Sequence, residues 1–255
     1  MVQPKKYLGQ HFLTDPGIAN RIADLLSTDS NSLLMEIGPG QGILTDFLLQ
    51  KSVKEFIAIE VDPEAVEFLE NRYKNRQLKI LREDFLKLPE AYFAHPDITI
   101  IGNLPYNISS QIFFKILEHR QSVKQVSCMI QKEVAERIVA PPGSKTYGIL
   151  SVLLQAYYQV QHQFNVKPGS FYPPPKVNSS VITLQRNNTW QLACNEALFF
   201  RIVKASFNQR RKMIRNSLKT ILLTLAEDFE LLSKRPEQLS VTEFVDLTNW
   251  LESKM

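Results

Sequence analysis

Residues 33–49 of this 255-residue chain are LLMEIGPGQGILTDFLL. The apolar run at 33–37 predicts a buried strand, and 43–49 predicts an apolar helical segment. The turn Gly38–Gly42 between them contains three glycines. Glycines let a ligand lie against the main chain where a Cβ would collide. A strand, a glycine-rich turn and a helix form the first unit of a doubly wound α/β domain.

The residues after this unit indicate the ligand. Glu60 follows an apolar strand at 56–59, and an acidic side chain in that place can hold ribose hydroxyls. Gly42 comes one residue earlier than the third glycine of a dinucleotide fingerprint, whose place Ile43 takes. The spacing favours S-adenosylmethionine over a nicotinamide dinucleotide. Asp84, after a strand at 78–81, can bind the adenine of this cofactor, or can simply cap the strand exit.

A polar tetrad, Asn103-Leu104-Pro105-Tyr106, follows the apolar strand at 98–101, and we expect Gly102 to turn the chain there. The Asn103 side-chain oxygen and the Leu104 carbonyl, held rigid by Pro105, can accept both hydrogens of an adenine amino group. Such bonds localise the lone pair of a poor nucleophile, and Tyr106 offers a flat face for the base. The tetrad predicts catalysis by positioning and electrostatics. The alternative is an ordinary strand-end turn.

Strands alternate with helices as far as about residue 139, which predicts a right-handed parallel sheet. Asp15 and Pro16 predict the start of an N-terminal helix. The segments 158–166 and 177–184 predict closing strands. We therefore expect an α/β fold, with a Rossmann-like seven-stranded methyltransferase sheet in residues 1–187 and a small all-helical domain in residues 188–255.

Composition narrows the class of protein. A hydrophobic content of 44% and a charged content of 22% are ordinary for a globular protein. No apolar stretch approaches the length of a membrane span, and no signal core follows the N-terminus. Cys128, Cys194 and the four histidines show no metal-ligand spacing. We expect a cytoplasmic monomer without a bound metal.

Positive charge is concentrated in one segment. The net charge is only +4, but seven basic residues and no acid lie between Arg201 and Thr220. On one continuous helix, four of them would fall close to one side. We expect this face to bind RNA phosphates, the alternative being a solvated helix. The expected RNA-binding residues are Lys204, Arg210, Arg211, Lys212, Arg215 and Lys219.

Together these segments resemble a known family, the KsgA-type rRNA adenine N6,N6-dimethyltransferases, which share their fold with the Erm methyltransferases. The matching segments span nearly the whole chain in family order, and the joint match is highly specific. They are 9–13 (GQHFL), 36–40 (EIGPG), 60–62 (EVD), 102–109 (GNLPYNIS), 171–177 (FYPPPKV) and 207–212 (FNQRRK).

The resemblance implies roles for individual residues at the cofactor site. His11, in place of the commoner Asn, and Leu13 would close over the cofactor. Gly38 and Gly40 would lie beneath it. The remaining implied cofactor ligands are Glu60 for the ribose, Asp84 for the adenine, and Asn103 between the cofactor and the target.

The resemblance also implies that Phe171 stacks on the target base together with Tyr106. The residues alone, without the resemblance, favour a core aromatic at Phe171 beside a proline-rich bend. The implied enzyme uses S-adenosylmethionine to dimethylate N6 of two adjacent adenines in a hairpin loop near the 3′ end of small-subunit rRNA. Its substrate would be an assembling small ribosomal subunit, and it would take part in ribosome biogenesis.

Two alternatives remain open. One is an Erm-like enzyme that acts on large-subunit rRNA; the 210–216 segment and Leu104 favour the small-subunit enzyme. The other, from a different class, is a catalytically silent RNA-binding factor on the same fold. The intact tetrad at 103–106 argues against it, because a protein that only binds RNA has no need of that arrangement.

Overall fold

The computed structural model describes residues 2–219 and 229–255. Contacts divide the chain into two compact units, Met1–Ala135 with Gln161–Arg186, and Glu136–Val160 with Asn187–Met255. Residues 136–160 are thus grouped with the C-terminal residues, although we expected them in the first domain. The division into domains 1–187 and 188–255 stays a prediction.

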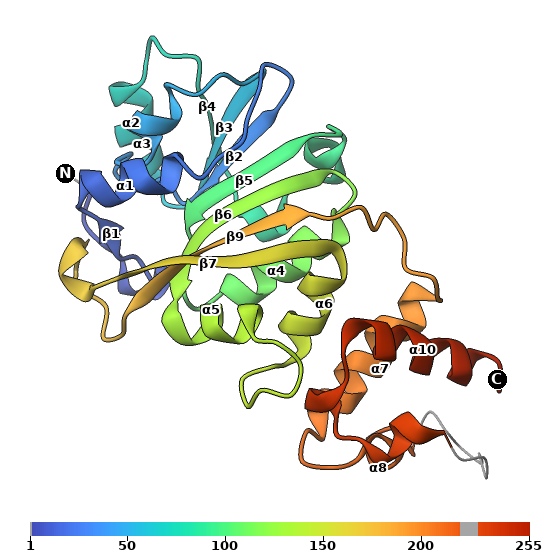
Figure 1. Cartoon of the computed structure of the whole chain (residues 1–255). Helices are drawn as coiled ribbons and strands as arrows, with labels where there is room; N and C mark the ends of the chain where they lie inside the picture. Colours follow the sequence, from blue (N-terminus) through green and yellow to red (C-terminus); the bar gives the residue numbers. More distant parts are fainter. Residues whose placement is uncertain (1, 220–228) are drawn as a thin grey trace. The chain divides into compact units, whose positions relative to one another are not determined.

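A seven-stranded sheet is the frame of the fold, in the order β4-β3-β2-β5-β6-β9-β7 (Figure 1). The β3–β4, β2–β3, β2–β5 and β5–β6 pairs are parallel, and β9 runs antiparallel to β6. This confirms the predicted Rossmann-like methyltransferase sheet. The strands are β2 (Leu33–Ile37), β3 (Glu55–Glu60), β4 (Lys79–Arg82), β5 (Ile98–Asn103), β6 (Val123–Gln131), β7 (Tyr158–Val166) and β9 (Ser179–Arg186).

Helices and short 3₁₀ turns connect these strands. The first helix begins where the sequence predicts, because Asp15 accepts hydrogen bonds from the backbone N–H groups of Gly17 and Ile18. The elements are η1 (Lys6–Leu8), α1 (Pro16–Ala23), α2 (Thr45–Leu48), α3 (Pro63–Arg72), η2 (Phe85–Lys87), η3 (Glu90–Phe93), α4 (Ser109–Glu118), α5 (Lys132–Val139) and η4 (Pro168–Ser170).

The main apolar core joins α1 and α2 to the sheet. Ile22 of α1 and Leu48 of α2 pack in one buried cluster with Leu34 of β2 and Ile101 of β5. A small two-stranded sheet extends this core: β1 (Phe12–Leu13) pairs antiparallel with β8 (Phe171–Tyr172). The N-terminal segment is thereby fastened beside the carboxyl ends of the strands.

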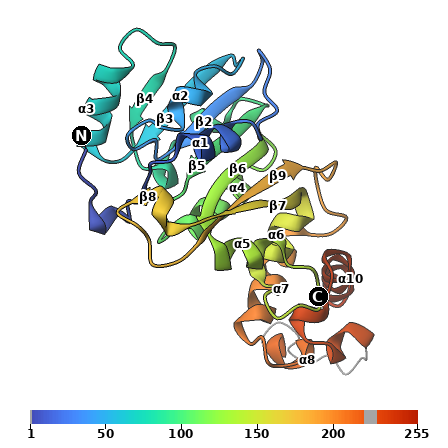
Figure 2. The same cartoon turned by 60° about the vertical axis from the view of Figure 1, so that its left-hand side comes forward.

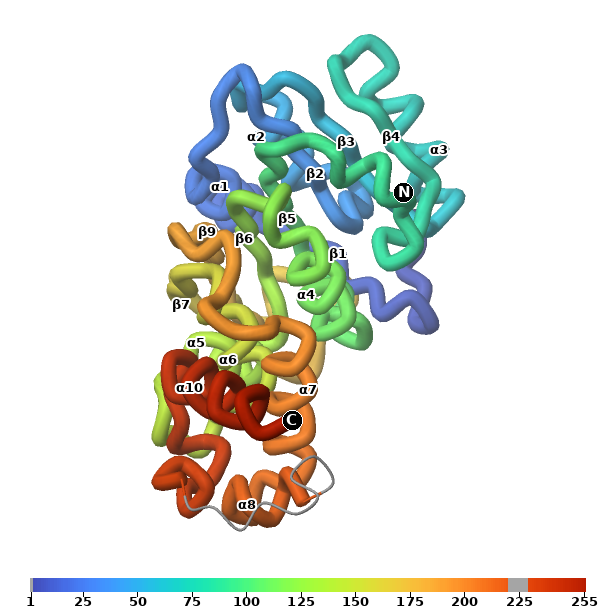
Figure 3. Tube along the Cα trace, turned by 90° about the vertical axis from the view of Figure 1, so that its right-hand side faces the viewer, coloured from blue at the N-terminus to red at the C-terminus, as the bar shows by residue number. Residues whose placement is uncertain are grey.

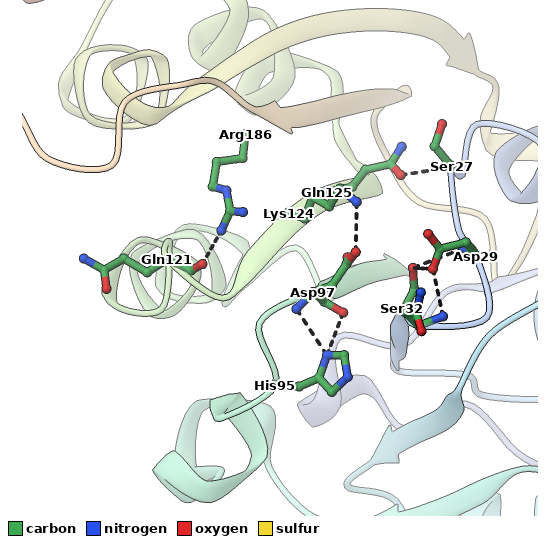
Figure 4. A network of polar contacts seen from close by, with 10 residues as sticks. Ser27, Asp29, Ser32, His95, Asp97, Gln121, Lys124, Gln125 and Arg186 are labelled. Atoms are coloured by element: carbon green, nitrogen blue, oxygen red, sulfur yellow. Dashed lines mark hydrogen bonds and ion pairs between the residues drawn. The ribbon is translucent and has the colours of Figure 1, made fainter.

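Polar contacts fasten the opposite ends of the central strands (Figure 4). The Gln125 side chain accepts a hydrogen bond from the Ser27 N–H and donates one to the Leu25 carbonyl, at 2.9 and 2.7 Å. Asp97, just before β5, pairs with Lys124 of β6 at 2.8 Å. These contacts tie the start of β6 to the segment after α1 and to the residue before β5.

The second unit contains α6 and helices from the C-terminal part of the chain. Within it, α7 and α10 lie side by side (Figures 2 and 3), and the rings of Phe207 and Phe244 are 6.1 Å apart. Ser240 and Glu243 form a capping box at the start of α10. The elements are α6 (Ile149–Tyr157), α7 (Glu196–Asn208), α8 (Ile214–Ser217), η5 (Glu230–Ser233), η6 (Pro236–Gln238) and α10 (Val241–Glu252).

The basic segment is not one helix, so that part of our prediction is wrong. Helix α7 ends at Asn208, and α8 begins at Ile214 after a tight turn. The Ile214 N–H donates to the Lys234 carbonyl at 2.8 Å, a distant backbone partner that a continuous helix would not allow. Lys204 and Arg211 therefore lie on different elements. Thr220, the last residue of the segment, lies outside the described residues.

Candidate active site

Most of the predicted catalytic and cofactor-binding residues converge at the carboxyl ends of β2, β3 and β5. Ligands of doubly wound sheets bind at this edge, where strand order reverses. One cleft is lined by Leu8, Gly9, Gln10, His11, Phe12, Gly38, Gly40, Glu60, Asn103, Leu104, Pro105 and Tyr106. An adjoining hollow shares Phe12, Gly38 and Asn103 with it, and also contains Leu13 and Glu36.

The glycine turn brings the N-terminal segment close to the main chain. Gly40 has a φ of 57°, and a Cβ built on it would lie 2.7 Å from a carbon of the Phe12 ring. The Phe12 ring fills the space beside Gly40, which still lines the cleft, and the expected contact of Gly40 with the cofactor stays a prediction. Gly38 has a φ of 66° and no such neighbour, since the nearest atom to its built Cβ is the Asn103 carbonyl oxygen at 3.9 Å. The open part of the turn is therefore at Gly38.

Glu60, the last residue of β3, is tied to this turn. Its Oε1 accepts hydrogen bonds from the N–H groups of Val61 and Asp62 at 2.9 and 3.0 Å, and its Oε2 accepts from the Gly40 N–H at 3.1 Å. Burial raises the pKa of Glu60, although these bonds oppose the shift. Oε2 keeps one lone pair for a further donor, such as a ribose hydroxyl.

Strand β5 carries Asn103 into the cleft. We expected Gly102 to end the strand, and this was wrong: β5 continues through Asn103, which pairs with Met129 of β6. A Cβ on Gly102 would collide with the carbonyl oxygen of Ile37. Glycine therefore allows β5 and β2 to approach each other, and the position of Asn103 is set by the sheet.

The Asn103 amide is oriented by a residue far away in sequence. Its Nδ2 donates to the His11 carbonyl oxygen at 2.8 Å. A carbonyl only accepts, so this contact assigns the amide nitrogen and leaves Oδ1 as the free acceptor. Oδ1 is buried and accepts no hydrogen bond from the described residues. An unsatisfied buried acceptor costs about 1–3 kcal/mol, so its presence calls for a functional explanation.

Tyr106 stands beside Asn103 and is also held by its neighbours. Its hydroxyl lies 2.5 Å from the Ser179 hydroxyl, and its ring faces the His11 ring, with centroids 5.6 Å apart and planes at 26°. Burial raises the pKa of Tyr106, so the phenol stays protonated. The His11 Nδ1 lies 2.7 Å from the Pro173 carbonyl and donates to it, which fixes the orientation of the imidazole.

Three predicted residues lie outside the main cleft. Asp84 caps η2 and accepts from the Leu86 N–H at 2.9 Å. Phe171 is only 4% exposed and packs in the core cluster, opposite Leu13 in the β1–β8 pair. Leu13 lines the adjoining hollow. The roles of these residues toward the cofactor and the target base stay predictions.

The structure adds residues that sequence reasoning did not single out. Val61, next to Glu60, is an apolar side chain that is 49% exposed. Ser179 holds the Tyr106 hydroxyl. Gln10 lies within the GQHFL segment and bonds to Asp62. The position of Gln10 within that motif was the available signal.

The basic residues lie on the second unit. Arg210 is half-buried and donates to the Ser144 carbonyl at 3.3 Å, so it fastens the 141–145 turn. Arg211, Lys212, Lys204, Arg215 and Lys219 are exposed. Their RNA contacts stay a prediction. Within residues 2–219 and 229–255, no group of three or more potential metal ligands occurs, and no helix is long and apolar enough to cross a membrane.

Comparison with known proteins identifies the family. The family model described as "Ribosomal RNA adenine dimethylase" matches residues 1–252. The chain belongs to this family. "Ribosomal RNA small subunit methyltransferase A" of Parabacteroides distasonis is 51% identical over 97% of this chain and 94% of the relative. The protein of the same name from Flavobacterium johnsoniae is 51% identical over 99% and 97%.

Solved structures agree in fold. A dimethyladenosine transferase from Plasmodium falciparum has a TM-score of 0.80 at 26% identity, and the match covers 96% of this chain and 98% of that chain. The 23S rRNA methyltransferase ErmE has a TM-score of 0.68 at 23% identity, covering 92% and 99%. At 23% identity, the likeness to ErmE shows the fold alone.

Family membership confirms that the chain is an enzyme, an S-adenosylmethionine-dependent rRNA adenine methyltransferase. The nicotinamide alternative and the catalytically silent alternative are thereby set aside. The cleft also fits this cofactor by its own chemistry. The open side of Gly38 admits a ligand to the main chain, Glu60 keeps an acceptor for a ribose hydroxyl, and Asn103 lines the same cleft.

Proposed function

We propose that this enzyme dimethylates N6 of two adjacent adenines in the 3′-terminal hairpin loop of small-subunit rRNA, during assembly of that subunit. Relatives that are 51% identical over nearly the full length carry the small-subunit name, whereas the large-subunit enzyme ErmE supports only the fold. Such a substrate is found in the cytoplasm of a bacterium. A loop adenine is accessible at low cost, because it is already partly unstacked.

The unpartnered Oδ1 of Asn103 is the observation that carries the proposal. It is an acceptor held ready for a donor, and an adenine amino group brings two N–H donors. The Leu104 backbone carbonyl is the second acceptor, and the Leu104 N–H is fixed by the Met129 carbonyl at 3.0 Å. When both N–H groups donate to these acceptors, the nitrogen lone pair is less delocalised into the ring and is directed toward the methyl donor. Asn103 and Leu104 thus act as positioned acceptors, without removing a proton.

Residues around the glycine turn would hold the cofactor. S-adenosylmethionine supplies a methyl group on a positively charged sulfur. Glu60 would accept from the ribose, and Gly38 would lie against the ligand. Val61, exposed beside Glu60, offers an apolar surface for the adenine ring. His11 and Leu13 would close the cleft from the N-terminal side, with Asp84 as the proposed adenine acceptor.

Aromatic rings would receive the target base. Tyr106 lines the cleft and has its hydroxyl bound to Ser179, which leaves the ring to stack. Phe171 is proposed as the second aromatic, but its burial means that it must first leave the core cluster. Tyr106 is therefore the stronger candidate for stacking.

The second unit would bind the rRNA backbone through exposed cations. Arg211 and Lys212 project from the turn between α7 and α8, with Lys204, Arg215 and Lys219 on the flanking elements. Arg210 would support this surface through the 141–145 turn. We expect the enzyme to act as a monomer.

The choice of substrate can be tested with purified enzyme. Small ribosomal subunits and large ribosomal subunits, each lacking adenine methylation, are incubated with S-adenosylmethionine. Nuclease digests are then analysed by mass spectrometry for N6,N6-dimethyladenosine, and primer extension locates it. Stops at two adjacent adenines near the 3′ end of the small-subunit rRNA support the proposal. Modification of the large subunit alone would favour the Erm-like alternative.

A further inference from the structure

The N-terminal segment 2–13 contributes the carbonyl that orients Asn103. Polar contacts among Lys5, Gln10 and Asp62 hold this segment in place, and we call these three residues the latch. Asn103 belongs to β5, whereas the His11 carbonyl belongs to a segment outside the large sheet. The orientation of the amide therefore depends on how firmly residues 2–13 are attached. We call residues 2–13 the N-terminal arm.

Apolar contacts attach the arm to the glycine turn and to α3. Val2 and Phe12 form a small buried cluster with Ala65, and Phe68 packs against it. The Gln41 side chain donates to the Val2 carbonyl at 3.1 Å. The apolar contacts have little directionality, so they keep the arm near the cleft without setting the position of an individual carbonyl. The Gln41 bond positions the Val2 carbonyl, at the far end of the arm from His11.

The latch supplies the direction, and it centres on Asp62. Lys5 Nζ lies 2.6 Å from Asp62 Oδ1 and 3.0 Å from Glu64 Oε1. Gln10 Nε2 donates to Asp62 Oδ2 at 3.0 Å, and Gln10 Oε1 accepts from the Lys5 N–H at 2.7 Å. One glutamine thus ties the two ends of η1 together and to a buried carboxylate.

Asp62 is well suited to serve as the anchor. Its side chain is fully buried, whereas that of Lys5 is 19% exposed. Burial tends to raise the pKa of Asp62, but the hydrogen bonds from Lys5, Gln10 and the Glu64 N–H, together with the Lys5 charge, lower the pKa overall. The Asp62 N–H also donates to Glu60 Oε1. The segment Glu60–Asp62 therefore connects the proposed ribose carboxylate to the arm.

We infer that Lys5, Gln10 and Asp62 are positioning residues for methyl transfer. Gln10 immediately precedes His11 in the chain, so the Gln10–Asp62 contact restrains the backbone at His11, together with the β1–β8 pairing and the His11–Pro173 contact. The His11 carbonyl in turn accepts from the Asn103 amide. Without the latch, only the β1–β8 pairing and the His11–Pro173 contact hold the His11 carbonyl, so the Asn103 amide is oriented less firmly toward the substrate amine. The inference rests on the proposed role of Asn103.

A charge swap across the latch tests this. Gln10→Glu places a second carboxylate against Asp62, whereas Gln10→Glu combined with Asp62→Asn restores one donor and one acceptor in reversed positions. Gln163→Ala is the matched control, because Gln163 donates one side-chain hydrogen bond at 2.7 Å to Thr183, on β9, and does not line the cleft.

Single-turnover methylation is measured with saturating S-adenosylmethionine and rRNA, alongside cofactor affinity by calorimetry and thermal unfolding. We expect the single-turnover rate of Gln10→Glu to fall at least tenfold. The double variant should recover to within about threefold of the wild type, and Gln163→Ala should keep the wild-type rate. Cofactor affinity should change less than the rate in every variant.

The Asn103 side-chain amide provides a readout that a purely structural role would not move. Its NMR signal, assigned by its loss in Asn103→Ala, should be protected from hydrogen exchange in the wild type and in the double variant, and unprotected in Gln10→Glu. A Gln10→Glu rate within twofold of the wild type would overturn the inference. So would a loss confined to cofactor affinity, because the latch would then only retain the cofactor.

The failure of this inference is distinguishable from failure of the proposed substrate. The wild-type rate on small subunits tests the substrate, whereas the ratio between variant and wild type on one substrate tests the latch. A wild-type enzyme inactive on small subunits would be compared with its variants on large subunits, where the same ratios apply.

Discussion

Thr45 donates a hydrogen bond to Glu36 at 2.7 Å, across the glycine turn that joins β2 to α2. Both side chains are buried, and Glu36 is only 1% exposed. Burial raises the pKa of Glu36 to about 8, while the hydrogen bond from Thr45 opposes the shift. The protonation state of this carboxyl therefore links the stability of the protein to pH.

Glu36→Gln should remove this pH dependence. The native carboxyl keeps its proton between about pH 4.5 and 8, whereas the unfolded chain loses it. The stabilisation is complete below the unfolded pKa and is lost as pH rises through that window, by roughly 1.4 kcal/mol per pH unit. Urea unfolding from pH 5 to 9 measures this. Parallel curves for variant and wild type would show that Glu36 does not titrate in this way.

Glu60→Ala should weaken S-adenosylmethionine binding by about 1–3 kcal/mol, the scale of a lost charged hydrogen bond. The same change removes the acceptor for the Gly40, Val61 and Asp62 N–H groups, so some stability is lost as well. Calorimetry below the melting temperature of the variant separates the two effects. rRNA affinity is the control and should stay the same. Unchanged cofactor affinity would exclude Glu60 from the site.

Tyr106→Phe should keep most of the activity because it keeps the ring, whereas Tyr106→Ala should lose stacking worth about 1–3 kcal/mol. Ser179→Ala breaks the same hydroxyl contact from the other side and should behave like Tyr106→Phe. Rates of all three variants are compared on one rRNA substrate. Equal losses in Tyr106→Phe and Tyr106→Ala would assign the role to the hydroxyl.

Neutralising Arg211 and Lys212 with glutamine should weaken rRNA binding and leave cofactor binding unchanged. Each phosphate contact removed should lower the salt slope of binding by about 0.7–0.9. Lys54→Gln with Lys74→Gln removes two exposed charges from the first unit and is the matched control. Filter binding across a potassium chloride series measures the salt slope of rRNA binding for both double variants and the wild type. An unchanged slope in the Arg211→Gln, Lys212→Gln variant would mean that these two residues are only solvated charges.

Sequence patterns predicted the parts of the fold that depend on local signals. The apolar run at 33–37 became β2, and Asp15 with Pro16 capped α1 as expected. Sequence patterns failed at Gly102 and between Asn208 and Ile214, where partners distant in the sequence determine the backbone conformation. Gly102 serves the approach of β5 to Ile37, and Ile214 bonds to Lys234. No local pattern encodes either contact.

The candidate site shows the same difference between local signals, which the sequence reveals, and distant contacts, which it does not. Glu60 and the 103–106 tetrad reached the cleft because each lies at the carboxyl end of a strand, and a parallel sheet places those ends at one edge. Phe171 did not, since its strand β8 pairs with β1 and turns the ring into the core. The orientation of Asn103 depends on His11, 92 residues earlier, and could only come from the folded chain.

The most direct test of the account is the single-turnover rate of Asn103→Ala. The variant removes the free acceptor Oδ1 and retains β5, because the backbone pairing with β6 does not involve the side chain. We expect methylation of rRNA adenines to slow by roughly a hundredfold or more, the usual loss for one oriented polar group in an active site. The melting temperature should stay close to wild type, and cofactor affinity should fall much less than the rate. A near-normal single-turnover rate in this variant would contradict the proposed mechanism.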